Sequence, residues 1–264
     1  MDYVVSYSGG LGSFCAAYRL KQSVPPSRIR LVFCDTLVED DDLYRFLDES
    51  ALKLGLELIK LKDGRHPWQV FADVRLQGNS RIAPCSRVLK RDVFNQWLAD
   101  NYQKQDGKYQ GVTVVMGIDY EEAERLERAK ANNPDQDIIA PLCDSPYIGR
   151  KEREAILADL NIEMPRLYSI GFPHNNCGGF CVRSGLAQFD LLRRSFPDRF
   201  KWHKEQQQAL SAAVPSANRP FLRKTINGKL NYITLAEFEE MKLSESEQLD
   251  FGGCGCFIDD EMGD

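Results

Sequence analysis

The sequence lacks most of the features that would assign it to a membrane, secreted or nucleic-acid-coating class. No stretch approaches the roughly 18 consecutive apolar residues that a membrane-spanning helix needs. The first residues, MDYVVSYSGG, contain no basic region of the kind that opens a secretory leader. The formal net charge is −5, which argues against a generally basic protein but leaves room for a local basic groove. We therefore expect a cytoplasmic protein with no membrane partner.

Two common phosphate-binding signatures are missing, and histidine, a common metal ligand, is scarce. The Walker A pattern G-x-x-x-x-G-K-[ST] does not occur, and neither does the dinucleotide-binding pattern G-x-G-x-x-G. The sequence has three histidines, and His66, His174 and His203 stand apart from one another. We assign none of them a metal or catalytic role.

What the sequence does have is an alternation of short apolar runs with amphipathic segments. Hydrophobic residues make up 43% of the chain, enough for a sizeable core. The expected strands are 3–7, 29–34, 57–61, 112–116 and 137–140, and the expected helices between and after them are 13–22, 41–55, 86–102, 121–131 and 150–159. Such alternation predicts βαβ units, and hence an α/β fold with a five-stranded parallel, doubly wound sheet.

The alternation of expected strands and helices stops near Pro165. This change predicts two domains, 1–165 and a helical region 166–264. An irregular Gly- and Asn-rich loop precedes a long helical stretch, 184–213, with a bend near Pro197. Residues 214–220 look like a linker. Residues 234–242 are expected to form a short helix, with Thr234 and Glu237 as its capping box.

A glycine- and serine-rich loop follows the first expected strand. Backbone N–H groups at a strand-to-helix turn lack internal partners and lie at the positive end of the helix dipole, so they bind anions. Glycine lets a phosphate approach the backbone closely, and serine adds hydroxyl donors. These properties predict a phosphate site made of Ser8, Gly9, Gly10, Gly12 and Ser13.

The order Ser8-Gly9-Gly10-Leu11-Gly12-Ser13 resembles the PP-loop of the ATP pyrophosphatase superfamily. Four further stretches resemble, in the same order, its branch of phosphoadenosine phosphosulfate (PAPS) reductases and DndC-type DNA phosphorothioation enzymes: LVFCDTLVEDDDLYRF, RIAPCSRVLKRDVF, MGIDYEEAERLER and PRLYSIGFPHNNCGGFCVRSG. The resemblance covers most of residues 1–185. It implies helices on both faces of a five-stranded parallel sheet, as the strand alternation also does.

The resemblance implies a nucleotide site at the carboxyl ends of the strands. Asp35 and Thr36 would lie near the adenosine, and Gly117 and Asp119 would line the site where the fourth strand ends. Arg125 belongs to the Gly-x-x-x-x-Glu-x-x-x-Arg pattern, one position short of the usual spacing. The i,i+4 pairs Glu121–Arg125 and Glu124–Arg128 are equally typical of surface ion pairs.

Cys85 lies among cations in the sequence. Positive side chains around a thiol bind phosphate or sulfate and lower the pKa of the thiol, although a solvated helix face has the same composition. The cations are Arg81, Arg87, Lys90 and Arg91. We take Cys85, Lys90 and Arg125 as the catalytic candidates and Arg81 as a nucleotide contact, and leave open whether Cys85 carries sulfur.

Four of the eight cysteines form two tight pairs, Cys177 with Cys181 and Cys254 with Cys256. Four thiolates suit tetrahedral Zn²⁺ and a [4Fe–4S] cluster equally well, and unliganded thiols are the alternative. Cys143 is an extra candidate ligand. Cys15 and Cys34 are expected in the core.

Two charged stretches have alternative interpretations. The acidic run 39–42 is expected as a solvated helix N-terminus, and a magnesium site is the second interpretation. The basic and aromatic stretch 191–204 suits a nucleic-acid strand, and an amphipathic helix with a core face explains the aromatic residues as well.

The leading hypothesis is an enzyme that binds ATP and Mg²⁺, cleaves ATP between the α and β phosphates and adenylylates a substrate, for sulfur transfer to a nucleic acid or to a small molecule. The first alternative is a PAPS- or APS-reductase-like oxidoreductase that uses thioredoxin. The chain lacks the usual Glu-Cys-Gly-Leu/Ile-His tail of those reductases. The second alternative is a non-catalytic, nucleotide-sensing subunit. The partners left open are a second copy of the chain or another protein.

Overall fold

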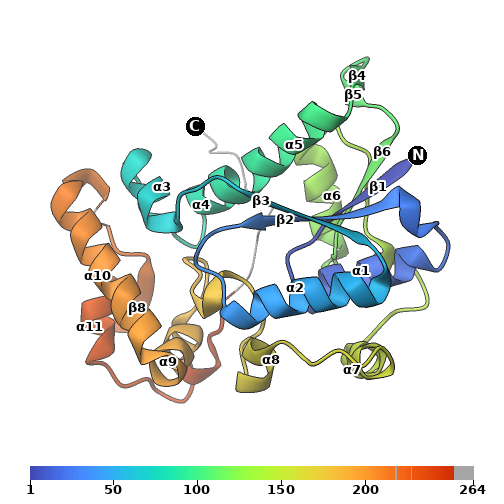
Figure 1. Cartoon of the computed structure of the whole chain (residues 1–264). Helices are drawn as coiled ribbons and strands as arrows, with labels where there is room; N and C mark the ends of the chain where they lie inside the picture. Colours follow the sequence, from blue (N-terminus) through green and yellow to red (C-terminus); the bar gives the residue numbers. More distant parts are fainter. Residues whose placement is uncertain (218, 227, 253–264) are drawn as a thin grey trace.

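The computed structural model describes residues 1–217, 219–226 and 228–252, and a parallel sheet lies at its centre (Figure 1). The strand order is β3-β2-β1-β6-β7, and every pairing in this sheet is parallel. The strands are β1 (Asp2–Ser6), β2 (Ile29–Asp35), β3 (Glu57–Lys62), β6 (Val112–Val115) and β7 (Ile138–Ile139). The five predicted strands therefore all form. The chain reverses its direction of winding between β1 and β6, the position where open α/β sheets bind ligands.

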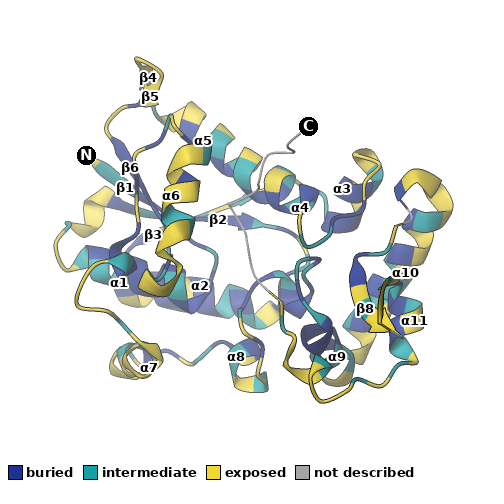
Figure 2. Ribbon diagram, turned by 180° about the vertical axis from the view of Figure 1, so that it is seen from behind, coloured by how far each residue is buried: buried dark blue, intermediate teal, exposed yellow. Residues whose placement is uncertain are grey.

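Helices cover both faces of this sheet, as predicted. Successive residues of a strand point to opposite faces, so Val5 packs into one core while Val4 packs into the other. On the Val5 face lie α1 (Leu11–Lys21), α2 (Asp41–Leu54) and α7 (Arg150–Asp159). On the Val4 face lie α5 (Val93–Asn101) and α6 (Ala123–Asn132). The apolar stripes of α1, α2, α5 and α6 are buried against the sheet while their outer faces are exposed (Figure 2), and α7 adds Leu157 to the same core as α1 and α2.

A second core lies beside the sheet, between helices from both parts of the chain (Figure 1). Its helices are α3 (Pro67–Asp73), α4 (Pro84–Ser86), α8 (Arg166–Ile170), α9 (Leu186–Ser195), α10 (Pro197–Ala213) and α11 (Leu235–Glu239). The predicted bend near Pro197 is confirmed, because α9 ends and α10 begins there. The capping box is confirmed too: Thr234 accepts from the N–H of Glu237, whose carboxylate accepts from the N–H of Thr234.

Helix α3 and two hairpins have no counterpart in the sequence analysis. Helix α3 lies in the breaker-rich stretch before α4, and within the predicted helix 86–102 the segment Arg87–Asp92 is a π-helix that joins α4 to α5. Two hairpins are added, β4 (Lys104–Gln105) with β5 (Lys108–Tyr109), and β8 (Leu222–Ile226) with β9 (Lys229–Ile233). Within the described part of the chain, no helix combines the length and apolarity required to cross a membrane.

The basic and aromatic stretch contributes its aromatic side chains to the second core. Phe200 and His203 are each 1% exposed, and the His203 ring stacks on Phe180 at 3.6 Å between ring centroids. The indole N–H of Trp68 donates to Nδ1 of His203 at 2.9 Å. The amphipathic-helix interpretation is therefore the better one for these aromatic residues.

The stability of the protein should fall as the pH is lowered from about 7.5 to about 5.5. Burial lowers the pKa of His203 well below its ordinary value, so the unfolded chain takes up a proton in this range that the folded chain does not. The loss is at most about 1.4 kcal/mol per pH unit from this one group. Urea unfolding at a series of pH values measures it. His203→Gln, which keeps an acceptor for Trp68, should flatten the dependence, and an unchanged slope would contradict this assignment.

Candidate nucleotide and thiol sites

The loop between β1 and α1 forms the floor of the candidate nucleotide site. Gly9 has a φ of +74°, a conformation that favours glycine, and extended Gly10 is the N-cap of α1 without a capping side chain. The N–H of Leu11 donates to the Tyr168 hydroxyl at 3.2 Å. Among the hydrogen bonds of the described residues, the N–H groups of Gly12 and Ser13 have no acceptor. They are donors at the positive end of a helix dipole, as an anion site requires.

The β1–α1 loop touches the end of β6 backbone to backbone. A Cβ atom on Gly12 would lie 2.7 Å from the carbonyl oxygen of Gly117, and one on Gly117 would lie 2.3 Å from the amide nitrogen of Ser13. Contacts this short leave no room for any side chain at either position. Glycine is therefore required at both, and the loop is fixed at the point where the winding of the sheet reverses.

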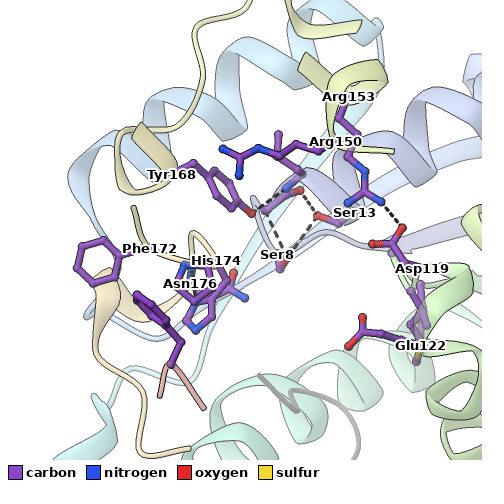
Figure 3. Close-up of a pocket in the computed structure, with 18 of the residues that line it drawn as sticks. Ser8, Ser13, Asp119, Glu122, Arg150, Arg153, Tyr168, Phe172, His174 and Asn176 are labelled. Carbon is purple, nitrogen blue, oxygen red and sulfur yellow. Dashed lines mark hydrogen bonds and ion pairs between the residues drawn. The ribbon is translucent and has the colours of Figure 1, made fainter. Parts of the chain in front are cut away.

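A cleft of about 820 Å³ opens over this loop. Its volume lies within the range of small-molecule sites. Figure 3 shows Ser8 and Ser13 at one wall, Asp119, Glu122 and Arg153 at a second, and Phe172, His174 and Asn176 at a third. The predicted residues that line it are Ser8, Gly10, Gly12, Ser13, Lys90, Gly117, Asp119 and Arg125. The PP-loop-like stretch and three of the four further stretches thus contribute residues to one cavity, whereas the stretch 31–46 does not line it.

The wall formed by α6 and α7 carries three arginines, each paired with a carboxylate. Arg153 bonds Asp119, Arg125 bonds Glu122 at 2.5 Å, and Arg150 bonds Glu154 at 3.0 Å. Within the part of the chain that the structure describes, the buried Nε of Arg125 has no hydrogen-bond partner. An anionic group in the cleft would give that N–H an acceptor. The i,i+4 pairs expected on α6 are replaced at Arg125 by the i,i+3 pair with Glu122.

Asp35 and Thr36 lie at the end of β2 but not in the lining of this cleft. Asp35 accepts from the N–H of Leu37 at 2.8 Å and from the Tyr44 hydroxyl at 2.9 Å. The Thr36 hydroxyl donates to Glu39 at 2.8 Å. The structure therefore gives both side chains local partners in the turn after β2.

The expectation of a solvated acidic run is wrong for two of its four residues. Glu39 is 8% exposed and bonds the N–H of Cys177, and Asp40 is fully buried between Arg166 and Arg199. Burial raises the pKa of Glu39, and the charge of Lys90 opposes that rise. Burial also disfavours ionised Asp40, but hydrogen bonds from Arg166 and Arg199 outweigh it and lower its pKa. Asp40 and Asp41 still begin α2 as predicted, with Asp40 as the N-cap.

A second, small cavity brings together three thiols. Cys85 lines it with Cys177 and Cys181, although more than 90 residues separate the first two in the chain. Lys90 lines both cavities and donates to the Cys177 sulfur at 3.7 Å. Of the four cations near Cys85 in the sequence, Lys90 is buried, Arg91 half-buried, and Arg81 and Arg87 exposed. We call the residues Cys85, Cys177 and Cys181 the thiol pocket.

The other cysteines differ in position. Cys254 and Cys256 lie outside the described residues, but Phe251 and Gly252, just before them, line the nucleotide cleft. Cys143 lies against the carbonyls of Ile118 and Asp119, apart from the thiol pocket. Cys15 and Cys34 are buried, as expected. Among residues 1–217, 219–226 and 228–252, no group of three or more His, Cys, Asp or Glu side chains could hold a metal ion.

Several residues that shape the cleft escaped the sequence analysis. Tyr168 bonds the first turn of α1, and the buried amide of Asn175 donates to the Gly9 carbonyl at 2.9 Å. Arg153 fixes Asp119, and His174 lines the cavity although it stands alone in the sequence. A sequence signal for some of these residues was the segment Arg166–Ser184, in which Asn, His and Gly residues accompany the cysteines.

Asn175→Ala should weaken the binding of inorganic pyrophosphate about tenfold and destabilise the fold by about 1–3 kcal/mol. The substitution removes a buried hydrogen bond that holds Gly9 in its left-handed conformation. Isothermal titration and urea unfolding measure the two effects. The control is Asn101→Ala, which removes a similar bond to Trp97 on the exposed surface of α5. Equal behaviour of the two variants would contradict a role for Asn175 in holding the loop.

No protein-family model matches the sequence, and the search of curated proteins found no match. Among solved structures, the chain is similar to PAPS reductase from Candida auris in a phosphate complex, at 13% identity and a TM-score of 0.42, covering 65% of this chain and 77% of that one. It is similar to NH3-dependent NAD synthetase from Campylobacter jejuni, at 13% identity and a TM-score of 0.37, covering 80% and 86%.

It is also similar to the U34-tRNA thiolase NcsA from Methanococcus maripaludis, which carries a [4Fe-4S] cluster, at 15% identity and a TM-score of 0.41, covering 95% and 83%. All three proteins are members of the PP-loop ATP pyrophosphatase superfamily. The fold assignment rests on the strand order and the cleft, and not on these overlaps, whose TM-scores are below 0.5.

Proposed function

We propose that this protein is a cytoplasmic PP-loop enzyme that binds ATP in the cleft over Ser8–Ser13 and cleaves it between the α and β phosphates. The observation that carries the proposal is the first turn of α1. There the N–H groups of Gly12 and Ser13 have no acceptor among the described residues. Both residues line a cleft of about 820 Å³ at the carboxyl ends of β1 and β6, where the winding of the sheet reverses. Such a turn binds the leaving pyrophosphate and stabilises its developing charge.

In the proposed reaction an oxygen of the acceptor attacks the α-phosphorus, the bond to the bridging α,β oxygen breaks, and pyrophosphate leaves. The contribution of the chain is to orient the phosphates and to match their charge. Lys90 and Arg125 line the same cleft and are suited to the α- and β-phosphates. The acceptor is then adenylylated, and AMP becomes the leaving group for a later sulfur transfer.

Mg²⁺ fits the donors of the cleft. Asp119 and Glu122 supply carboxylate oxygens, and one or two carboxylates with phosphate oxygens are the usual environment of this ion. Mg²⁺ supplies charge neutralisation between phosphate oxygens. We propose these two residues as its protein contacts.

A zinc ion or a [4Fe–4S] cluster fits the donor chemistry of the thiol pocket in part. Cys85, Cys177 and Cys181 line one cavity, but among the described residues they do not form a complete metal site. We propose that the tail pair, Cys254 and Cys256, completes a set of four thiolates with Cys177 and Cys181. A cluster there would hold or activate sulfur for transfer to a nucleic acid or a small molecule.

One observation favours the reductase alternative as a second candidate. Phe251 and Gly252 line the cleft, so the tail that contains Cys254 and Cys256 begins at the nucleotide site. In that reaction a tail thiolate would attack the sulfur of an adenylyl sulfate, and thioredoxin would reduce the product.

One experiment separates these functions. The purified protein is incubated with α-labelled ATP and Mg²⁺, with and without nucleic-acid and small-molecule acceptors, and the products are resolved. AMP or an adenylylated acceptor together with pyrophosphate supports the proposal. Sulfite released from PAPS in the presence of thioredoxin supports the reductase. Nucleotide binding with neither product indicates a sensing subunit, and ADP with phosphate contradicts cleavage between the α and β phosphates.

A further inference from the structure

The loop that contains Cys177 is held by three separate contacts, two to the turn after β2 and one to α10. The N–H of Cys177 donates to the Glu39 carboxylate. Gly178 approaches so closely that a Cβ atom there would lie 2.5 Å from the carbonyl oxygen of Val38. The carbonyl of Gly178 accepts a hydrogen bond of 2.6 Å from Arg199. Cys177 itself has a φ of +54°, a conformation that costs energy for a residue with a side chain.

Arg199 reaches this loop from α10, and its orientation is fixed by two neighbours. Its second guanidinium nitrogen bonds the fully buried Asp40 at 2.8 Å, and its guanidinium lies over the Phe196 ring at 4.4 Å. One planar guanidinium thus spans a buried carboxylate and a main-chain carbonyl of the cysteine loop. A lysine cannot make both bonds in this fixed geometry.

Arg166 shares both neighbours of Arg199 but does not share its contact with the loop. It makes a bidentate pair with Asp40 at 2.7 Å, and its guanidinium lies over the same Phe196 ring at 5.5 Å. Its other hydrogen bond, from its own N–H to Asp42, leads toward α2 and away from Cys177. The chain therefore contains a matched pair of arginines, one of which touches the cysteine loop.

We propose that Arg199 is a positioning residue that sets the orientation of the Cys177 thiol in the thiol pocket, through its hydrogen bond to Gly178 and its pair with Asp40. The proposal rests on the proposed function only in so far as Cys177 serves that pocket. A strained residue such as Cys177 keeps its conformation only when its surroundings fix it from several sides. Arg199 supplies the one charged contact to this loop from α10 among the described hydrogen bonds.

The test measures the rate at which iodoacetamide labels Cys177, by peptide mass spectrometry, in full-length protein after treatment with a chelator and without nucleotide. Arg199→Met should change the Cys177 rate at least about fivefold, because the freed loop relaxes toward solvent and exposes the thiol more. Arg166→Met should leave the rate within about twofold of wild type while lowering thermal stability to a similar degree. The labelling rate of Cys143, which lies elsewhere, is the internal reference.

Two further variants keep the outcome decisive if Arg199→Met folds poorly. Arg199→Lys retains a cation beside Asp40 and should still show the faster labelling of Cys177. Gly178→Ala displaces the loop from the Val38 carbonyl, and its Cβ atom would also lie 3.3 Å from Nη1 of Arg199, so it disturbs the same contact and should act in the same direction. Equal labelling of Cys177 in the Arg199 and Arg166 variants, or wild-type labelling in Arg199→Lys, would overturn the proposal. Because no nucleotide is present, this result is independent of whether the protein cleaves ATP.

Discussion

Replacing Gly12 by alanine is expected to weaken the binding of inorganic pyrophosphate about a hundredfold, whereas replacing Gly10 by alanine should weaken it less than about threefold. The added methyl group of Gly12→Ala would lie 2.7 Å from the main-chain oxygen of Gly117, so the β1–α1 loop must move off β6. That movement displaces the N–H groups of Gly12 and Ser13. Two hydrogen bonds to a charged ligand contribute about 1.5–3 kcal/mol each, so weakening both without losing either completely accounts for a hundredfold loss, about 2.7 kcal/mol.

The same substitution two residues earlier is a matched control. A Cβ atom on Gly10 would lie 3.2 Å from the Tyr168 hydroxyl, the end of a side chain that can give way. Isothermal titration with pyrophosphate measures the affinities, and circular dichroism establishes that both variants are folded. If folded Gly12→Ala binds pyrophosphate as wild type does, the loop is not the anion site.

Lys90→Met is expected to destabilise the protein by about 3 kcal/mol, measured by urea unfolding at neutral pH. Lys90 is 6% exposed, and its charge acts on the buried carboxylate of Glu39 and on the region of the Cys177 sulfur. Removal of this cation leaves the buried Glu39 carboxylate without the positive charge that favours its ionised form. The double variant with Glu39→Gln should regain part of the lost stability, because the remaining buried charge is then removed.

Arg91→Met is the control for Lys90. Arg91 is the next residue and also a cation, but it is only half-buried, so its loss should cost less than about 0.5 kcal/mol. A Lys90→Met protein as stable as Arg91→Met would contradict a buried, charge-compensating role for Lys90.

The sheet could be predicted because its signals are local. Strands such as Ile29–Asp35 are buried on both faces, so they appear as continuous apolar runs bounded by helical periodicity. The β1–α1 loop could be predicted for a similar reason, since glycines and serines after a first strand have few other uses. The resemblance predicted which strand ends line the site, and Gly117 and Asp119 do line the cleft together with the β1–α1 loop.

The parts that could not be predicted depend on contacts between distant segments. Tyr168 and Asn175 bond the β1–α1 loop from 157 and 166 residues away in the chain. No rule of sequence spacing predicts contacts between such distant residues. The burial of Asp40 depends on arginines from α8 and α10, which are far away in the sequence. The acidic run by itself therefore has the composition of a solvated helix N-terminus. Cys85 joins Cys177 in one pocket only because α4 packs beneath the cysteine loop.

The central claim is tested most directly by a crystal structure with Mg²⁺ and the α,β-methylene analogue of ATP, which cannot be cleaved at the proposed bond. The account predicts the β- and γ-phosphates over the first turn of α1, with phosphate oxygens about 3 Å from the amide nitrogens of Gly12 and Ser13. An analogue bound elsewhere, with those two amides still lacking a ligand, would contradict it.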